Sequence, residues 1–370
     1  MRRFMLLAAA ALAALPALAA SAALPETNAV LAGAAYIKSI QLANGTYGTT
    51  SPGQNVDAIL AVRSAGYDPA KDTVEGRGPV DYLEVNAANA TSAAAAAKAA
   101  LGAKALGLDP RAVNGTDLIA RVSGSYDSAK GTYADDTFSQ SIAMLGLACT
   151  GNPVPSAAAG ALKAAQEPSE GGWGFGGASD PDTTAIAIQA LLAAGVPKTD
   201  SAVAKGLAYL KEHQGDDGGF GYETSESNVS STAYVIQALL ALGENPESAA
   251  YTKNGRTPVA YLLSQQNADG SFKGFDPAFA TNQALPALAG RTFCNAAETP
   301  ITRTRPAVTP TPTPRPATAT PVPPLTPAPK PPATGNTSPG EAGLPPAALA
   351  GLALAGLGVF ALAAGRRRQG

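Results

Sequence analysis

Apolar residues fill almost every position of a segment that recurs along the middle of the chain. The copies at 182–195 and 230–243 lie 48 residues apart and share Thr-Ala, Ile-Gln-Ala-Leu-Leu-Ala and a closing glycine. Other copies fit the frame less completely: residues 141–151, the segments that end at Gly66 and Gly107, and one whose end begins at Gln283. A helix that is apolar on nearly every side is buried within a protein, and glycine commonly ends a helix. The pattern therefore predicts six buried inner helices.

A second repeated segment precedes these helices, and its polar residues recur with helical spacing. The segment ends in a glycine-rich turn that contains one aromatic residue. Four copies carry a glutamine before the turn: Gln41 with Tyr47, Gln166 with Trp173, Gln214 with Phe220, and Gln266 with Phe272. The pattern predicts an amphipathic outer helix whose turn aromatic packs back against the helix end.

Six such pairs, outer helix then inner helix, fill residues 31–294 at about 44 residues per pair. Self-similarity at a fixed period indicates stacked helical units. The Gln…Gly-x-aromatic repeat resembles that of the terpenoid cyclase and protein prenyltransferase superfamily, which also includes the cobalamin carriers transcobalamin and intrinsic factor. This resemblance implies an all-α fold, an α6/α6 toroid over 31–294. It does not imply one function, because the superfamily holds enzymes and carriers alike.

The two ends of the chain predict export and anchoring. Residues 1–22 read as a signal peptide, with basic residues, an apolar run and small residues at the cleavage site. Residues 300–343 form a Pro/Thr-rich linker, 344–365 an apolar transmembrane helix, and 366–370 a basic cytoplasmic tail. We therefore expect a head held at the cell surface. Sortase-type attachment at Pro331–Gly335, a degenerate form of the sortase signal, is the alternative to membrane anchoring.

Charge and composition narrow the classes of partner. Residues 23–299 carry 17 basic and 27 acidic groups, a net charge of −10, which disfavours nucleic acid. The chain has one histidine, His213, and two cysteines, so we expect no metal site and no cofactor. In an exported protein Cys149 and Cys294 can form a disulfide, provided that the chain after Gly290 crosses back over one end of the toroid. The sequence leaves this pairing open.

In the toroid that the resemblance implies, the turns after the outer helices meet at one mouth and bring acidic and aromatic residues together over an apolar lumen. The polar members are Asp135, Asp136, Asp180, Asp182, Asn228, Ser230 and Asp276. The aromatic members are Tyr47, Tyr133, Trp173, Phe175, Phe220, Tyr222 and Phe275. Such a mouth is a candidate ligand site. The alternative interpretation is that the polar residues are helix N-caps and the aromatics are packing residues.

One motif at this mouth is similar to the acid motif of class II terpene cyclases, Asp-x-Asp-Asp-Thr-Ala. The chain has Asp180–Pro181–Asp182–Thr183–Thr184–Ala185, so the first two carboxylates match and Thr183 replaces the last one. By this resemblance Asp182 would protonate an alkene and Asp180 would support it. The incomplete motif and the aliphatic inner helices favour another hypothesis: a non-catalytic surface module that binds an apolar or mixed-polarity, lipid-like small molecule or an envelope protein. The alternatives are a terpene-cyclase-like enzyme, and corrinoid binding together with a partner domain.

Overall fold

The computed structural model describes residues 24–49, 51–175, 178–222 and 226–304. The predicted signal peptide, nearly all of the Pro/Thr-rich linker, the predicted transmembrane helix and the basic tail lie outside these residues. Within the described ranges, no helix combines the length and the apolar character needed to cross a membrane.

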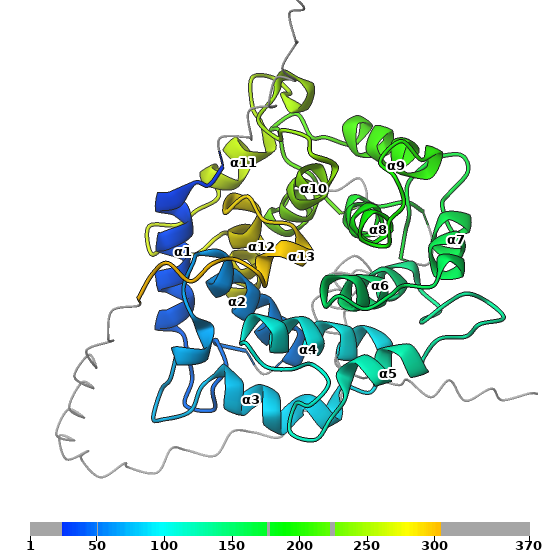
Figure 1. Cartoon of the computed structure of the whole chain (residues 1–370). Helices are drawn as coiled ribbons and strands as arrows, with labels where there is room; N and C mark the ends of the chain where they lie inside the picture. Colours follow the sequence, from blue (N-terminus) through cyan, green and yellow to red (C-terminus); the bar gives the residue numbers. More distant parts are fainter. Residues whose placement is uncertain (1–23, 50, 176–177, 223–225, 305–370) are drawn as a thin grey trace, which may run out of the picture.

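Six inner helices form a closed ring (Figure 1). They are α2 (Pro52–Ser64), α4 (Ala93–Ala105), α6 (Thr137–Cys149), α8 (Pro181–Ala193), α10 (Val229–Leu242) and α12 (Pro277–Leu288). Each packs against the next along the chain, and α12 returns to α2. Nearly every residue of these helices is buried, as their apolar sequences predict.

Six outer helices surround the ring (Figure 1). They are α1 (Thr27–Ser39), α3 (Pro79–Asn86), α5 (Leu118–Gly124), α7 (Ser156–Ala164), α9 (Ser201–Glu212) and α11 (Pro258–Ser264). Outer and inner helices alternate along the chain, and the described residues form only isolated β-bridges besides helices and turns. The prediction of an all-α toroid of six helix pairs is confirmed.

Local sequence explains where the inner helices begin and end. Side chains cap the N-termini of five of them by accepting backbone N–H groups: Ser92, Asp136, Asp180, Asn228 and Asp276. Beyond the C-termini stand glycines with positive φ: Gly66, Gly107, Gly151, Gly195, Gly243 and Gly290. Glycine adopts this left-handed conformation without steric cost, so it stops a helix cleanly.

The repeated glutamines join neighbouring repeats. The Nε2 of Gln214 donates to Gly218 O in its own turn, at 2.9 Å, and to Tyr251 O in the next repeat, at 2.8 Å. Gln266 donates in the same way to Gly270 O and to Ala29 O, at 3.1 and 2.9 Å. Because Ala29 belongs to α1, this last bond ties the sixth repeat to the first and helps to close the toroid.

The turn aromatics are buried as predicted, and side chains of the inner helices accept hydrogen bonds from the backbone N–H groups of these aromatic residues. Trp173, Phe220 and Phe272 are at most 1% exposed. Their backbone N–H groups donate to the side chains of Thr184, Thr232 and Thr281, each at 2.9 Å. Asn55 and Gln140 accept from Tyr47 and Tyr133 in the same manner. A polar residue near the start of an otherwise apolar helix therefore fixes the turn that precedes it.

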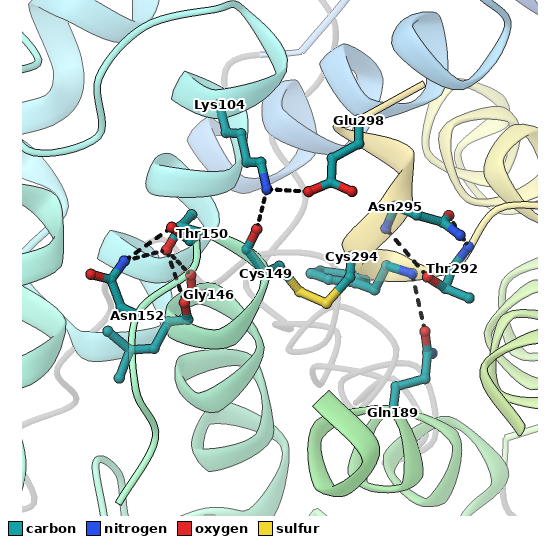
Figure 2. The surroundings of a disulfide bond; sticks show 12 residues. Lys104, Gly146, Cys149, Thr150, Asn152, Gln189, Thr292, Cys294, Asn295 and Glu298 are labelled. Carbon is teal, nitrogen blue, oxygen red and sulfur yellow. Dashed lines mark hydrogen bonds and ion pairs between the residues drawn. A yellow bond between two sulfur atoms is a disulfide. The ribbon is translucent and has the colours of Figure 1, made fainter. Parts of the chain in front are cut away.

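The chain after α12 crosses the C-terminal ends of the inner helices. We call residues 291–304 the strap; it contains the short helix α13 (Phe293–Ala296). A disulfide joins Cys294 to Cys149 at the end of α6, with the two Cα atoms 4.7 Å apart (Figure 2). The Phe293 N–H donates to Gln189 Oε1 at 3.1 Å, and Lys104 contacts both Cys149 O and Glu298. The strap thus covers one end of the ring, which is the path that a disulfide required.

Candidate functional site

The mouth is the end of the ring where the inner helices begin, opposite the strap. Asp136, Asp180, Asn228 and Asp276 lie there as the N-caps of four successive inner helices. Each accepts backbone N–H groups of its own helix, so each has a structural role at this position. Asp135 lies apart from them, with a fully exposed side chain 3.9 Å from Lys130 Nζ.

Asp180 differs from the other caps because it is almost completely buried. Its carboxylate accepts the Thr183 N–H at 2.7 Å and the Phe175 N–H at 3.3 Å. Burial raises the pKa of Asp180 to about 6, although these hydrogen bonds lower it. Near neutral pH, Asp180 is therefore mostly ionised and holds a negative charge inside the mouth.

Asp182 lies two residues after Asp180, in the first turn of α8, and is 6% exposed. Burial raises its pKa to about 7, the charge on Asp180 adds to the rise, and a hydrogen bond with the Ser231 side chain lowers it. Its Oδ1 has no hydrogen-bond partner among the described residues. Asp182 is thus a buried carboxyl that retains a proton up to nearly neutral pH and has an oxygen free to donate it.

The Ser231 side chain links Asp182 to the cap of the neighbouring inner helix. The Asn228 Nδ2 donates to Ser231 Oγ at 2.9 Å, which leaves the Ser231 hydroxyl hydrogen available for Asp182. Ser230, the residue predicted from the sequence, is half-buried, whereas Ser231 is 1% exposed. Ser231 could have been found from its position three residues after the N-cap Asn228, because the side chain of an N-cap accepts the backbone N–H at that position.

The aromatic residues of the mouth fall into two groups. Trp173 and Phe220 are buried in their turns, and the Trp173 Nε1 donates to Leu162 O at 2.7 Å. These two rings offer no surface to a ligand here. Phe175 is 38% exposed, Phe275 is 97% exposed, and Tyr222 is half-buried. Two apolar rings near N-caps are therefore accessible to a ligand: Phe175 near Asp180 and Phe275 beside Asp276.

The interior of the ring is polar, so the expectation of an apolar lumen is wrong. Asp57 on α2 pairs with Lys98 on α4, with Nζ and Oδ2 2.8 Å apart. Burial raises the pKa of Asp57, although Lys98 lowers it. Burial also raises the pKa of Tyr234 well above its ordinary value, with added effects from the charges of Asp57 and Asp182. Sequence reasoning missed these residues because a helix that is buried all round gives no sign of which side faces inward.

The cavity beside Asp57 inside the ring is small. A cavity of about 10 Å³, lined by Asp57, Gln237, Asn282, Gln283 and strap residue Phe293 among others, has room for about one water molecule. Sites for drug-sized ligands are ordinarily about 300–1,000 Å³. Within the described part of the chain, no group of three or more His, Cys, Asp or Glu residues is arranged to hold a metal ion.

Comparison with known proteins adds a family match over the second half of the toroid. Residues 134–286, from just before α6 to near the end of α12, match the squalene-hopene cyclase C-terminal domain. A squalene–hopene cyclase from Zymomonas mobilis subsp. mobilis is 31% identical over 145 residues. That alignment covers 36% of this chain and only about a fifth, 21%, of the relative.

Solved structures share the fold of nearly the whole toroid. A type II terpene cyclase, MstE from Scytonema, in complex with the substrate geranylgeranyl dihydroxybenzoate, has a TM-score of 0.52 at 14% identity. The match covers 74% of this chain and 97% of that one. A complex of the same cyclase with the product merosterolic acid A has a TM-score of 0.55 at 15% identity, covering 73% and 96%. At these identities the likeness concerns the fold.

Proposed function

We propose that this chain, which is similar to terpene cyclases in part of its sequence and in its fold, is a class II terpene-cyclase-like isomerase in which Asp182 protonates an alkene of a prenyl compound. One observation carries the proposal: Asp182 is a buried carboxyl with a pKa of about 7 and an oxygen that has no partner among the described residues. It lies in a segment, residues 134–286, that matches a cyclase domain. This function replaces the non-catalytic module as the first hypothesis.

The reaction that fits this site starts with proton transfer. The electron pair of the alkene forms a C–H bond with the Asp182 proton, which leaves a carboxylate on Asp182 and a tertiary carbocation on the substrate. Loss of a proton from a carbon next to the cation, or next to a cation formed by ring closure, restores a double bond. This proton returns to Asp182 directly or through water. The net change is an isomerisation, so no cofactor or co-reactant is consumed.

The neighbours of Asp182 have separate roles in this scheme. The Asp180 charge opposes ionisation of Asp182 and so keeps the acid protonated, while the Ser231 hydrogen bond stabilises the carboxylate that forms. Tyr234 and Phe138 pack edge to face with ring centroids 6.4 Å apart and supply aromatic faces for a nearby cation. Thr183 stands where the cyclase motif has another carboxylate, so we expect slow turnover.

The part of the interior next to Asp57 limits the substrate. Its cavity measures about 10 Å³ and an ion pair joins Asp57 to Lys98, so a long prenyl chain cannot fold in this part of the ring. Asp182 is 6% exposed and its Oδ1 is buried, so the start of α8 must open before one terminal double bond of a substrate can reach Asp182 from the mouth. This supports a single isomerisation or ring closure rather than polycyclisation.

The test is deuterium transfer from solvent. The full chain is incubated in D₂O with geranylgeranyl and shorter prenyl substrates, and products are analysed by mass spectrometry for one added deuterium on carbon. We expect Asp182→Asn to lower turnover by at least about 10³-fold, since an amide cannot serve as the acid. Asp136→Asn is the matched control, because Asp136 caps another inner helix at the same mouth. Equal turnover by Asp182→Asn and the parent protein would remove Asp182 from the reaction.

A second candidate is a non-catalytic head that binds a lipid-like molecule or an envelope protein at the mouth. The exposed ring of Phe275, 97% accessible beside the Asp276 cap, favours this candidate. Binding of a prenyl compound with no deuterium transfer, unchanged by Asp182→Asn, would support it over the enzyme.

Display outside the cell is part of both candidates. The proposal rests on the predicted signal peptide and C-terminal anchor, and the Cys149–Cys294 disulfide supports it because such bonds persist in oxidising compartments. The location is tested by treating intact cells with a protease. Loss of the toroid from the cells is the expected result, and full protection would contradict display at the surface.

A further inference from the structure

A second hollow lies at the strap end of the toroid, away from Asp182. It has a volume of about 230 Å³ and is walled by the start of α1, the residues that follow α2, and the strap. Two backbone bonds fix one wall, because the N–H groups of Thr302 and Arg303 both donate to Gly66 O, at 3.0 and 3.1 Å. We call this space the strap-end hollow.

Two arginines give the strap-end hollow its charge. Arg291 and Arg303, one at each end of the strap, both line it, and its described lining residues include no Asp or Glu. The Nε of Arg291 is buried and has no hydrogen-bond partner among the described residues. A buried donor without an acceptor is costly, so an acceptor from outside the chain would be stabilised here.

Three threonines also line the hollow: Thr27, Thr299 and Thr302. The hydroxyl groups of Thr27 and Thr299 already donate to Pro25 O and Asn295 O, at 3.4 and 3.5 Å, which leaves Thr302 as the neutral donor of the three. Thr27 also begins α1, a helix of 13 residues whose N-cap, Glu26, makes no side-chain capping bond. No side chain at the N-cap position therefore accepts the first-turn N–H groups of α1.

Opposing charges are present as well. The helices α2 and α12 end here, and the partial negative charge of helix C-termini disfavours an anion while it favours arginine. Glu26 lies between the lining residues Pro25 and Thr27. The two guanidinium groups, rather than the helix ends, must supply the attraction for an anion.

We propose that the strap-end hollow binds the phosphate group of a small molecule. Arginine presents paired N–H donors that match phosphate oxygens, and the Thr302 hydroxyl supplies a further donor for a remaining oxygen. The volume admits a phosphate with a short organic substituent. This site is independent of the proposed alkene chemistry, because it lies at the opposite end of the ring.

The experiment is a calorimetric titration of the full chain with inorganic phosphate, pyrophosphate and glycerol 3-phosphate. We expect Arg291→Gln and Arg303→Gln each to weaken binding about 10- to 100-fold. Arg291→Lys should give an intermediate affinity, because it retains the charge but loses the paired donors. Glu26→Gln should tighten binding, because it removes a negative charge next to the hollow.

The matched control is Arg77→Gln, which changes an exposed arginine in the turn before α3. Circular dichroism melting checks that each variant is folded.

The source of the phosphate is decided by a second arm with lipid vesicles. Capture by phosphatidylglycerol vesicles over phosphatidylcholine vesicles, lost in Arg291→Gln and not in Arg77→Gln, assigns the site to a lipid headgroup. Binding of the soluble phosphates with the same dependence assigns it to a free metabolite. The proposal is overturned if neither arm shows binding, or if binding is the same in Arg291→Gln as in the parent protein.

Discussion

The two ends of the ring are made from the same six helices, yet they differ in almost every physical respect. At the mouth, helices begin, and caps such as Asp136, Asp180 and Asp276 accept their free N–H groups. At the strap end, helices stop at left-handed glycines, and the strap covers them. Parallel helices place all their N-termini together, so acidic caps gather at one end and basic residues are favoured at the other. Because all six inner helices point the same way, the acidic N-caps lie at one end of the ring and the strap covers the other.

This comparison also separates chemistry from stability. The mouth holds Asp182, a buried carboxyl that keeps its proton to about pH 7. The strap end holds the disulfide, which joins residues 145 positions apart. We expect changes at the mouth to alter proton-linked properties, and changes at the strap end to alter the free energy of unfolding at every pH.

The largest stability effect should come from the disulfide. Changing both Cys149 and Cys294 to Ser opens a loop of 145 residues, and a cross-link of this span contributes about 2–5 kcal/mol by limiting the unfolded chain. Urea unfolding of the Ser double variant and the oxidised parent protein measures the difference. If the two ends are independent, deuterium transfer at the mouth stays unchanged in the variant. Equal unfolding midpoints would mean that the strap adds nothing to stability.

The next effect is a pH dependence that originates at the mouth. The folded protein holds a proton on Asp182 to about pH 7, whereas an unfolded Asp loses it near 3.8. The folded state thus binds more protons between these values, and its free energy of unfolding falls as the pH rises from about 4 to 7. Asp182→Asn should flatten this fall and be more stable at pH 8 by on the order of 3 kcal/mol. In this variant, Asp180 still makes the free energy of unfolding fall with rising pH, by a smaller amount and only up to about pH 6. An unchanged profile in Asp182→Asn would contradict the raised pKa.

A smaller pair of effects compares the two ends of one helix, α6. Asp136→Ala removes the N-cap that accepts the Ser139 N–H at 2.7 Å and should cost about 1 kcal/mol. Gly151→Ala places a side chain at φ +80°, with no atom within 4 Å of its Cβ, and should cost about 1 kcal/mol through backbone strain alone. Thermal melts of both variants and the parent protein at pH 7 measure the two losses. An unchanged melting temperature in Asp136→Ala would mean that the capping bond adds nothing to the stability of α6.

The smallest stability effect is expected at Phe275. Because this ring is 97% exposed, Phe275→Ala should change the free energy of unfolding by less than about 0.5 kcal/mol. If the mouth receives prenyl compounds, the same change should weaken their binding, as measured by tryptophan fluorescence or calorimetry. A large loss of stability would show that Phe275 packs against the protein rather than facing a ligand.

Much of the architecture could be predicted from local patterns. The glycine stops at Gly195 and Gly243, and the glutamines before each aromatic turn, identify the repeats and their order. The N-cap interpretation of Asp136, Asp180, Asn228 and Asp276 agrees with the hydrogen bonds that they make. All of these features depend on residues within a few positions of one another, so the sequence carries them directly.

The candidate site was only partly predictable. The Asp180 and Asp182 pair follows from a motif, but its raised pKa values follow from burial, which depends on the neighbouring helix α10 and its Ser231. The polar interior could not be foreseen, since Asp57 and Lys98 lie 41 residues apart and each looks like a lone charge in an apolar helix.

The sequence by itself therefore determined the helix pairs, their direction, their caps and stops, and the acidic character of one end, because these are local consequences of spacing and residue type. Only the tertiary structure decided that the ring closes through Gln266 and Ala29, that the strap reaches Cys149, and that Asp182 is buried. These features arise when segments far apart in the chain meet and exclude water. Burial and long-range pairing depend on all six repeats at once, and no single repeat contains them.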